Sequence, residues 1–281
     1  MPEKPANASG YNPGQLPRVR ATCLYVATKL GDLMNDLVVV GGLVPSLLID
    51  QQKRPPEVPA HVGTMDLDLG LAFALVNEQR YEAVAERLRR AGFAPDENAE
   101  GNPTRQRWQI SDPPVTVDFL IEPADAMAQA GRLFSLERDL AAVIAPGLHL
   151  AFEDRESVAL EGLTIHDEQA RRTIQVSGPG AFVALKSLAF HLRGENKDAY
   201  DLHYVLRNFG SGPHDVARRL KPLLQDAMAQ EAIRYLREDF GDRTALGPRR
   251  VAEFLYGRPD EATQADVAGF VRRLLTFVEP T

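Results

Sequence analysis

The sequence predicts an α+β fold, in which a mixed sheet with flanking helices is followed by a helical part. Three observations lead to this prediction. Strand-like patterns crowd the first two-thirds of the 281 residues, helical periodicity dominates the last third, and the glycine- and proline-containing segment 176–180 separates them. We therefore predict a flexible tail over residues 1–17, a strand-rich domain over 18–178 and a helical domain over 179–281.

The composition is that of an ordinary globular protein, with 44% hydrophobic and 25% charged residues, which excludes wholesale disorder. The formal net charge of -7 argues against a general nucleic-acid coat but leaves room for a local basic face. The longest charge-free apolar run, residues 37–49, is shorter than the roughly 20 residues of a membrane-spanning helix. A single cysteine excludes an intramolecular disulfide and a Cys-based zinc site. Since the N-terminus also lacks a secretory pattern, we predict a cytoplasmic protein without a membrane span.

The first predicted elements surround a pair of glycines. Residues 18–35 are expected to form a helix, because apolar side chains recur there at helical spacing. The β-branched run 37–40 predicts a buried strand, which ends at Gly41 and Gly42. A helix is expected directly after the glycines, and the prolines of 53–59 predict a loop behind it.

The elements that follow alternate between strands and a helix. Residues 65–73 alternate apolar and polar side chains, which predicts a half-buried strand. An amphipathic pattern over 78–91, stopped by Gly92, predicts a helix. We predict two further strands over 106–110 and 115–121 with a turn at 111–114 between them, then a variable stretch, and helices from 181 onward.

Gly41 and Gly42 stand where a predicted strand passes into a helix. Glycines let a backbone approach a phosphate closely, and a helix N-terminus offers N–H groups and the positive end of a dipole. The segment therefore favours a phosphate-binding loop, with Ser46 as a further phosphate contact. It lacks the G-x-G-x-x-G pattern of dinucleotide sites.

Three aspartates form the second candidate feature. Asp66 and Asp68 are two residues apart on one predicted strand, so both carboxylates point to one face. Asp118 lies on the polar parity of the strand over 115–121. Carboxylate oxygens are ligands that Mg²⁺ prefers, and two such ions about 3.5–4 Å apart can activate an attacking oxygen and steady a leaving pyrophosphate. The aspartates therefore predict a site for one or two Mg²⁺ ions that serves phosphoryl-type transfer.

The order of these motifs, Gly41-Gly42, then Asp66-Leu-Asp68, then Asp118, resembles the signature of DNA-polymerase-β-type nucleotidyltransferases. The resemblance implies a polymerase-β-like nucleotidyltransferase fold for the strand-rich domain. It also implies that the glycine motif opens a helix, that the aspartate pair binds metal and that the third carboxylate completes the site.

A second block of residues lies in the predicted helical part. Lys186 and Arg193 are two helical turns apart, so they share a face that can meet a triphosphate. Asp198 and Asp201 are neighbours on the next helix, where one of them can orient Lys186 or accept a proton from an acceptor hydroxyl. With the motif Lys-Asp-Ala-Tyr-Asp-Leu at 197–202, this block is similar to the AbiEii and MenT group of nucleotidyltransferase-like toxins. The resemblance covers roughly residues 36–207.

This resemblance implies an Mg²⁺-dependent enzyme that moves a nucleoside monophosphate from an NTP to an acceptor, releases pyrophosphate and acts as the toxin of a toxin–antitoxin system. The implied acceptor is an RNA, such as a tRNA 3′ end, or a protein hydroxyl, and the implied protein partner is an antitoxin. The implied metal ligands are Asp66, Asp68 and Asp118, the nucleotide contacts are Gly41, Gly42, Ser46, Lys186 and Arg193, and the remaining catalytic groups are Lys186, Asp198 and Asp201. Two alternatives stay open: nucleotidylation of a small molecule such as an antibiotic, and a catalytically silent nucleotide-binding or interaction module.

Overall fold

The computed structural model describes residues 5–51, 53, 58–72, 78–98, 100–110 and 115–279. The turn predicted at 111–114 and most of the predicted proline loop lie outside the described residues. The chain divides into two compact units. Unit 1 holds residues 13–43 and 63–176, and unit 2 holds residues 5–12, 44–62 and 177–281.

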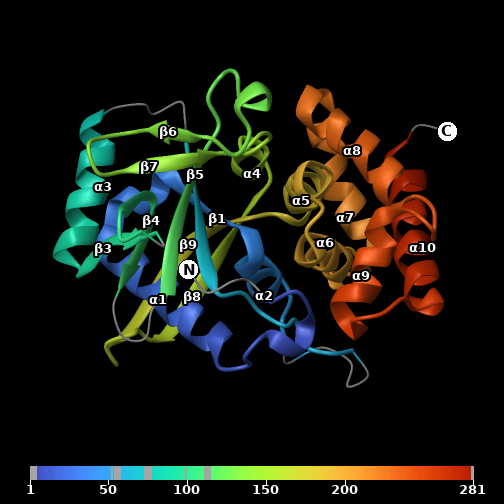
Figure 1. Cartoon of the computed structure of the whole chain (residues 1–281), viewed down its shortest axis with the longest axis horizontal. Helices are drawn as coiled ribbons and strands as arrows, with labels where there is room; N and C mark the ends of the chain where they lie inside the picture. The colour runs from blue at the N-terminus through green and yellow to red at the C-terminus, as the bar shows by residue number, and fades with distance from the viewer. Residues whose placement is uncertain are drawn as a thin grey trace. The chain divides into compact units, whose positions relative to one another are not determined.

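Unit 1 is built on a mixed sheet, into which the described residues place nine strands. The strand order is β3-β4-β5-β2-β1-β9-β8, with β7 beside the end of β5 and β6 beside β7 (Figure 1). The strands are β1 (Leu37–Val40), β2 (Asp66–Leu71), β3 (Phe93–Glu97), β4 (Pro103–Ile110), β5 (Val115–Ile121), β6 (Leu133–Ser135), β7 (Ala141–Ile144), β8 (Arg155–Leu163) and β9 (Gln169–Ser177).

The centre of the sheet follows the predicted hydrophobic pattern. All four residues of β1 are buried, and β2 buries Leu67 and Leu69 completely on one face. Helix α1 (Gln15–Leu30) packs against β2 and β5, next to α3 (Glu78–Arg90), and α4 (Leu150–Glu153) contacts β1. The helix predicted over 18–35 thus ends earlier, because Gly31 has a φ of 58° and the chain continues as a 3₁₀ helix, Gly31–Asp36.

The stretch that shows no clear pattern in the sequence contains β6 to β9. Strand β9 lies parallel to β1, with Val176 beside Val39, and so completes the centre of the sheet. Burial alternates along β8, with one face exposed throughout and the other half-buried around Leu160. The half-buried face carries Glu156 and the exposed face carries Ala159 and Leu163, so the sequence does not show the alternation by which strands are predicted.

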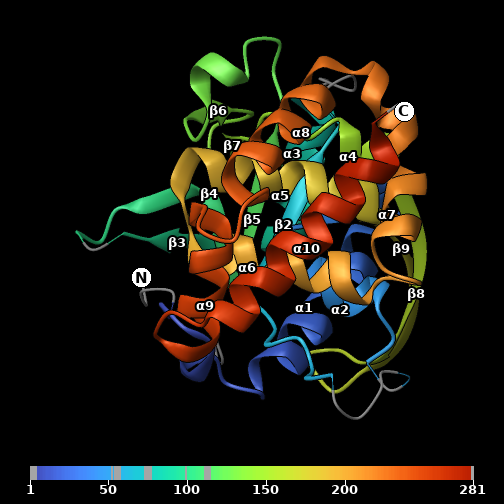
Figure 2. The same ribbon diagram turned by 90° about the vertical axis from the view of Figure 1, so that its right-hand side faces the viewer.

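Unit 2 is helical. Its long helix α5 packs against α6, α7 and α8, and α10 lies across α7, α8 and α9 (Figure 2). Residues 5–12, within the segment predicted as a tail, belong to this unit, where the Tyr11 ring meets the Phe254 ring edge-on at 5.7 Å. The helices of this unit are α2 (Val44–Leu48), α5 (Pro179–Arg193), α6 (Asn196–Asn208), α7 (Pro213–Leu220), α8 (Ala227–Phe240), α9 (Leu246–Tyr256) and α10 (Glu261–Val278).

The mixed sheet with its helices and the helical C-terminal part confirm the predicted α+β class. Within the described part of the chain, none of the helices is long and apolar enough to cross a membrane.

Candidate active site

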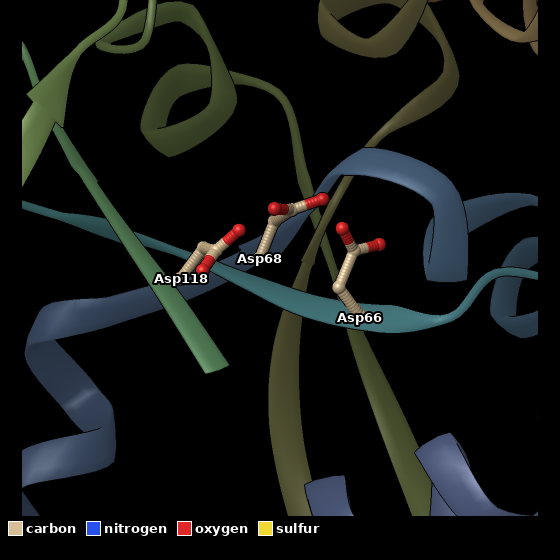
Figure 3. Close-up of side chains that lie close together, drawn as sticks. All are labelled: Asp66, Asp68 and Asp118. Carbon is tan, nitrogen blue, oxygen red and sulfur yellow. The ribbon is translucent and has the colours of Figure 1, made fainter. Parts of the chain in front are cut away.

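The three predicted aspartates come together on β2 and β5. These strands are parallel, and their register places Asp68 directly beside Asp118. Asp66 lies two residues earlier on the same face of β2. Figure 3 shows Asp66 and Asp68 rising from the same side of β2, with the carboxylate of Asp118 beside them. One oxygen from each of the three carboxylates lies within 4.8 Å of the others.

Gly41 fits directly against this group. Its φ is 69°, a conformation that side chains other than glycine rarely adopt. A Cβ atom at this position would lie only 1.8 Å from Oδ2 of Asp68. The missing side chain of Gly41 therefore makes room for the carboxylate of Asp68, which is a more specific reason for glycine than the phosphate approach expected from the sequence. Ser46, the further phosphate contact of the prediction, is buried in the five-residue helix α2 of unit 2.

Two polar neighbours hold the outer carboxylates. The hydroxyl of Thr64 donates to Oδ1 of Asp66 at 2.7 Å. Strand β4 runs antiparallel to β5 and sets Arg107 opposite Asp118. Nε of Arg107 donates to Oδ1 of Asp118 at 2.6 Å, and Nη2 donates to Oδ2. This two-point pair raises the pKa of Arg107, so its guanidinium stays charged.

The donor set suits a magnesium ion. Three carboxylates offer hard oxygen ligands at a spacing that one ion, or a bridged pair, can span. Bringing three negative charges this close costs free energy by mutual repulsion unless cations offset it. Beyond Asp68, this face of β2 is covered, because a Cβ on Gly70 would lie 2.9 Å from Leu148.

Unit 2 contains a second group of charged residues, centred on Lys186. Its Nζ donates to Oδ1 of Asp198 at 2.7 Å and to Oδ2 of Asp201 at 2.8 Å. Arg193 forms a two-point pair with Asp198, from Nε at 2.6 Å and Nη2 at 2.9 Å, while more than half of its side chain remains exposed. The structure therefore joins all four predicted residues of the helical part in one network.

Asp201 is the most deeply buried member of this network, with no exposed surface. Besides Lys186, its carboxylate contacts Lys197 and, at 2.8 Å, Nε2 of His61. The His61 ring stacks on Tyr200, with centroids 5.3 Å apart and an interplanar angle of 23°. His61 thus brings residues 58–62 onto α6, a contact that no pattern in the sequence indicates.

Burial and pairing act in opposite directions on these charges. Burial disfavours the ionised form of Asp198, but Lys186 and Arg193 outweigh it and lower its pKa to about 2. The pKa of Asp201 is likewise held below its ordinary range, since Lys186 and Lys197 outweigh its burial. For Lys186, burial is outweighed by the two carboxylates, which raise its pKa. At neutral pH the network therefore consists of ionised carboxylates and a protonated Lys186.

Acid is expected to destabilise the protein in two steps. Burial lowers the pKa of His61 to about 4, against about 6.5 in an unfolded chain, so the free energy of unfolding falls as pH drops from about 6.5 to 4. The lowered pKa of Asp198 stabilises the fold above about pH 4, and this contribution is lost as pH falls toward about 2. Urea unfolding between pH 7 and 2 measures both steps. His61→Gln should reduce the loss of unfolding free energy between pH 6.5 and 4. The loss that remains in this variant comes from His203, whose pKa burial lowers to about 3. An unchanged dependence of the unfolding free energy on pH in this range would contradict the assignment to His61.

Residues outside the predicted site complete both groups. Arg107 and Thr64 each hold a carboxylate of unit 1, and His61 and Lys197 hold Asp201 in unit 2. Lys197 begins the predicted motif at 197–202, and Arg107 lies on a predicted strand next to the one that carries Asp118. Its pairing depends on the register between β4 and β5, which periodicity does not specify.

A glycine turn and three aspartates on neighbouring strands of a mixed sheet define a nucleotidyltransferase-like α+β fold. The family described as "Nucleotidyl transferase AbiEii toxin, Type IV TA system" matches residues 29–280, so the chain belongs to the AbiEii family of nucleotidyltransferase toxins. The match extends well beyond residues 36–207, the span that the motifs indicated, and includes the C-terminal helices. A search of the curated proteins finds no match.

Proposed function

We propose that this protein is an Mg²⁺-dependent nucleotidyltransferase that transfers a nucleoside monophosphate from an NTP to an acceptor and releases pyrophosphate. The observation that carries the proposal is the group Asp66, Asp68 and Asp118, with oxygens within 4.8 Å of one another in a chain of the AbiEii family. Bound Mg²⁺ supplies charge neutralisation at the phosphates and lowers the pKa of an attacking hydroxyl.

The residues of unit 1 have distinct parts in this proposal. Asp66 and Asp68 hold the metal, and Asp118 assists. Gly41 keeps the position of Asp68 open, and Gly42 continues the turn in which the phosphates are bound, with Ser46 as a further contact. Because Thr64 fixes the carboxylate of Asp66 and the register of β2 and β5 sets Asp68 beside Asp118, the ligands are already close together before the metal binds.

The network of unit 2 serves the nucleotide in this proposal. Lys186 and Arg193 bind the triphosphate. An ammonium group has three N–H donors, and among the described residues two carboxylates accept from Lys186, which leaves one donor for a phosphate oxygen. Asp198 and Asp201 keep Lys186 protonated and oriented, and one of them accepts the proton of the acceptor hydroxyl.

The acceptor and the protein partner are proposed from the resemblance to nucleotidyltransferase toxins. We propose an RNA acceptor, with a tRNA 3′ end as the first to test, or a protein hydroxyl. We also propose that an antitoxin binds this protein, because the family belongs to type IV toxin–antitoxin systems.

Asp66→Ala tests the proposal. Wild-type protein incubated with Mg²⁺, total RNA and each labelled NTP in turn should transfer label, and Asp66→Ala should abolish the transfer because a metal ligand is lost. Asp125→Ala, which removes an exposed aspartate of the same unit, should transfer label like the wild type.

Three outcomes of this assay would overturn parts of the proposal. Undiminished transfer by Asp66→Ala excludes these carboxylates from the chemistry. Label on an added aminoglycoside rather than on RNA selects the small-molecule alternative. Binding of ATP or GTP without any release of pyrophosphate selects the silent module.

A further inference from the structure

Arg107 pairs directly with Asp118, one of the three aspartates of the candidate metal site. Four adjacent strands align Val40, Asp68, Asp118 and Arg107 in a single row across the sheet. Arg107 and Asp118 are both largely buried, with 19% and 13% of their side chains exposed. Such an in-register pair is held by the sheet itself, so the guanidinium is a fixed part of the site.

The contact uses both oxygens of Asp118. Nε of Arg107 donates to Oδ1 at 2.6 Å and Nη2 donates to Oδ2. Asp118 is also one of the three carboxylates whose oxygens lie within 4.8 Å of each other. Because Arg107 contacts both oxygens of Asp118, a metal ion that binds either of them shares that oxygen with the guanidinium or displaces the guanidinium from it.

Arg107 can oppose metal binding by repulsion or favour it by positioning Asp118, and the charges at the site show that repulsion is the larger effect. Three carboxylates and one guanidinium carry two more negative than positive charges, a surplus that a single divalent cation balances. The positive charge of Arg107 repels such an ion across a few ångströms of largely buried structure, where Coulomb interactions are stronger than in water. Positioning of Asp118 by the arginine favours metal binding only through preorganisation, which register with Asp68 already provides.

We propose that Arg107 is a built-in counter-cation that competes with the metal for Asp118 and makes metal binding depend on the nucleotide. This inference rests on the metal site of the proposed function. Without nucleotide, Arg107 neutralises Asp118 and keeps the affinity for a free divalent ion low. The phosphates of an NTP bring the negative charge that offsets Arg107, so metal and nucleotide bind cooperatively, each increasing the affinity for the other.

The experiment measures metal binding directly, with Mn²⁺ as the probe. Electron paramagnetic resonance of free Mn²⁺ gives the affinity of the full-length protein, with and without a non-hydrolysable NTP analogue. Arg107→Gln should bind Mn²⁺ about tenfold or more tightly than the wild type when no nucleotide is present. The analogue should tighten Mn²⁺ binding clearly in the wild type and much less in Arg107→Gln.

Two further variants act as controls. Arg105→Gln removes the same charge from the same strand, but Arg105 pairs with Ser135 and the carbonyl of Glu137, so the affinity should stay at the wild-type value. Arg107→Lys keeps the charge without the two-point contact and should fall between the wild type and Arg107→Gln. This variant also keeps the test decisive if Arg107→Gln does not fold.

The outcomes separate this inference from the proposed function. If Arg107→Gln, or Arg107→Lys in its place, binds Mn²⁺ as the wild type does or more weakly, Arg107 is not a competitor and the inference fails. If Asp68→Asn leaves the Mn²⁺ affinity of the wild type unchanged, the ion does not bind these carboxylates, and the metal site of the proposed function fails with it.

Discussion

Gly41→Ala is expected to lower the proposed nucleotidyl transfer on the order of 100-fold, because it displaces Asp68, a proposed metal ligand. The added Cβ would lie 1.8 Å from Oδ2, 2.7 Å from Cγ and 2.9 Å from Cβ of Asp68, so the whole carboxylate has to move. Asp68 lies in register with Asp118, and a shift of about 1 Å in one ligand is enough to disturb a shared metal site. Initial rates of label transfer from the NTP measure the effect.

A second glycine separates the clash from backbone strain. Gly101 has a φ of 79°, close to the 69° of Gly41, but a Cβ at Gly101 would meet nothing within 4 Å. Both substitutions therefore carry the strain of a left-handed alanine, about 1–2 kcal/mol of unfolding free energy, and only Gly41→Ala also moves Asp68. Equal activity losses in the two variants would show that contact with Asp68 is not what Gly41 provides.

Asp201→Asn is expected to lower the free energy of unfolding by about 3–5 kcal/mol. Asp201 is fully buried, and its carboxylate is shared by Lys186, Lys197 and His61. Asparagine has nearly the same shape but no charge, so Lys197 loses its buried counter-charge and Lys186 keeps only Asp198. Urea unfolding at pH 7, where the wild-type carboxylate is ionised, measures the change.

Asp266→Asn is the matched control for this prediction. Asp266 belongs to the same unit and pairs with Arg207 at 2.9 Å, but 40% of its side chain is exposed. A solvent-exposed pair of this kind contributes at most about 1 kcal/mol. If Asp201→Asn and Asp266→Asn lower the free energy of unfolding equally, the buried network of Lys186 contributes no more stability than an exposed ion pair.

The sequence predicts the central strands and the aspartates because each depends on local pattern. Alternation over residues 65–73 places Asp66 and Asp68 on one face, and strand β5 carries Asp118 on its polar parity as predicted. The same local signals fail for β8, because its half-buried face carries Glu156 and its exposed face carries Leu163. Pairing with β9 holds this strand, so its sequence carries little periodicity.

The partners of the site residues depend on register and tertiary contact, which a pattern does not specify. Arg107 meets Asp118 because β4 and β5 pair in one particular register, and a slip of one residue would send it to the other face. His61 reaches Asp201 across 140 residues of chain. The left-handed turn at Gly41 is compatible with a phosphate loop and with contact to a carboxylate, and its contact with Asp68 depends on the pairing of β1 with β2, which the sequence pattern does not specify.

The parallel pairing of β1 with β9 has a consequence for the order of events during synthesis. All three aspartates are present once the chain has been synthesised to residue 118. Strand β1, which leads into Gly41, pairs with β2 and β9, and β9 is available only after residues 169–177 have been synthesised. Pairing between Val39 and Val176 closes a long loop, the kind of contact that forms slowly. A chain that has been synthesised as far as β5 therefore contains all three aspartates while the sheet still lacks β9, so the strand that leads into Gly41 is completed only by late, long-range pairing.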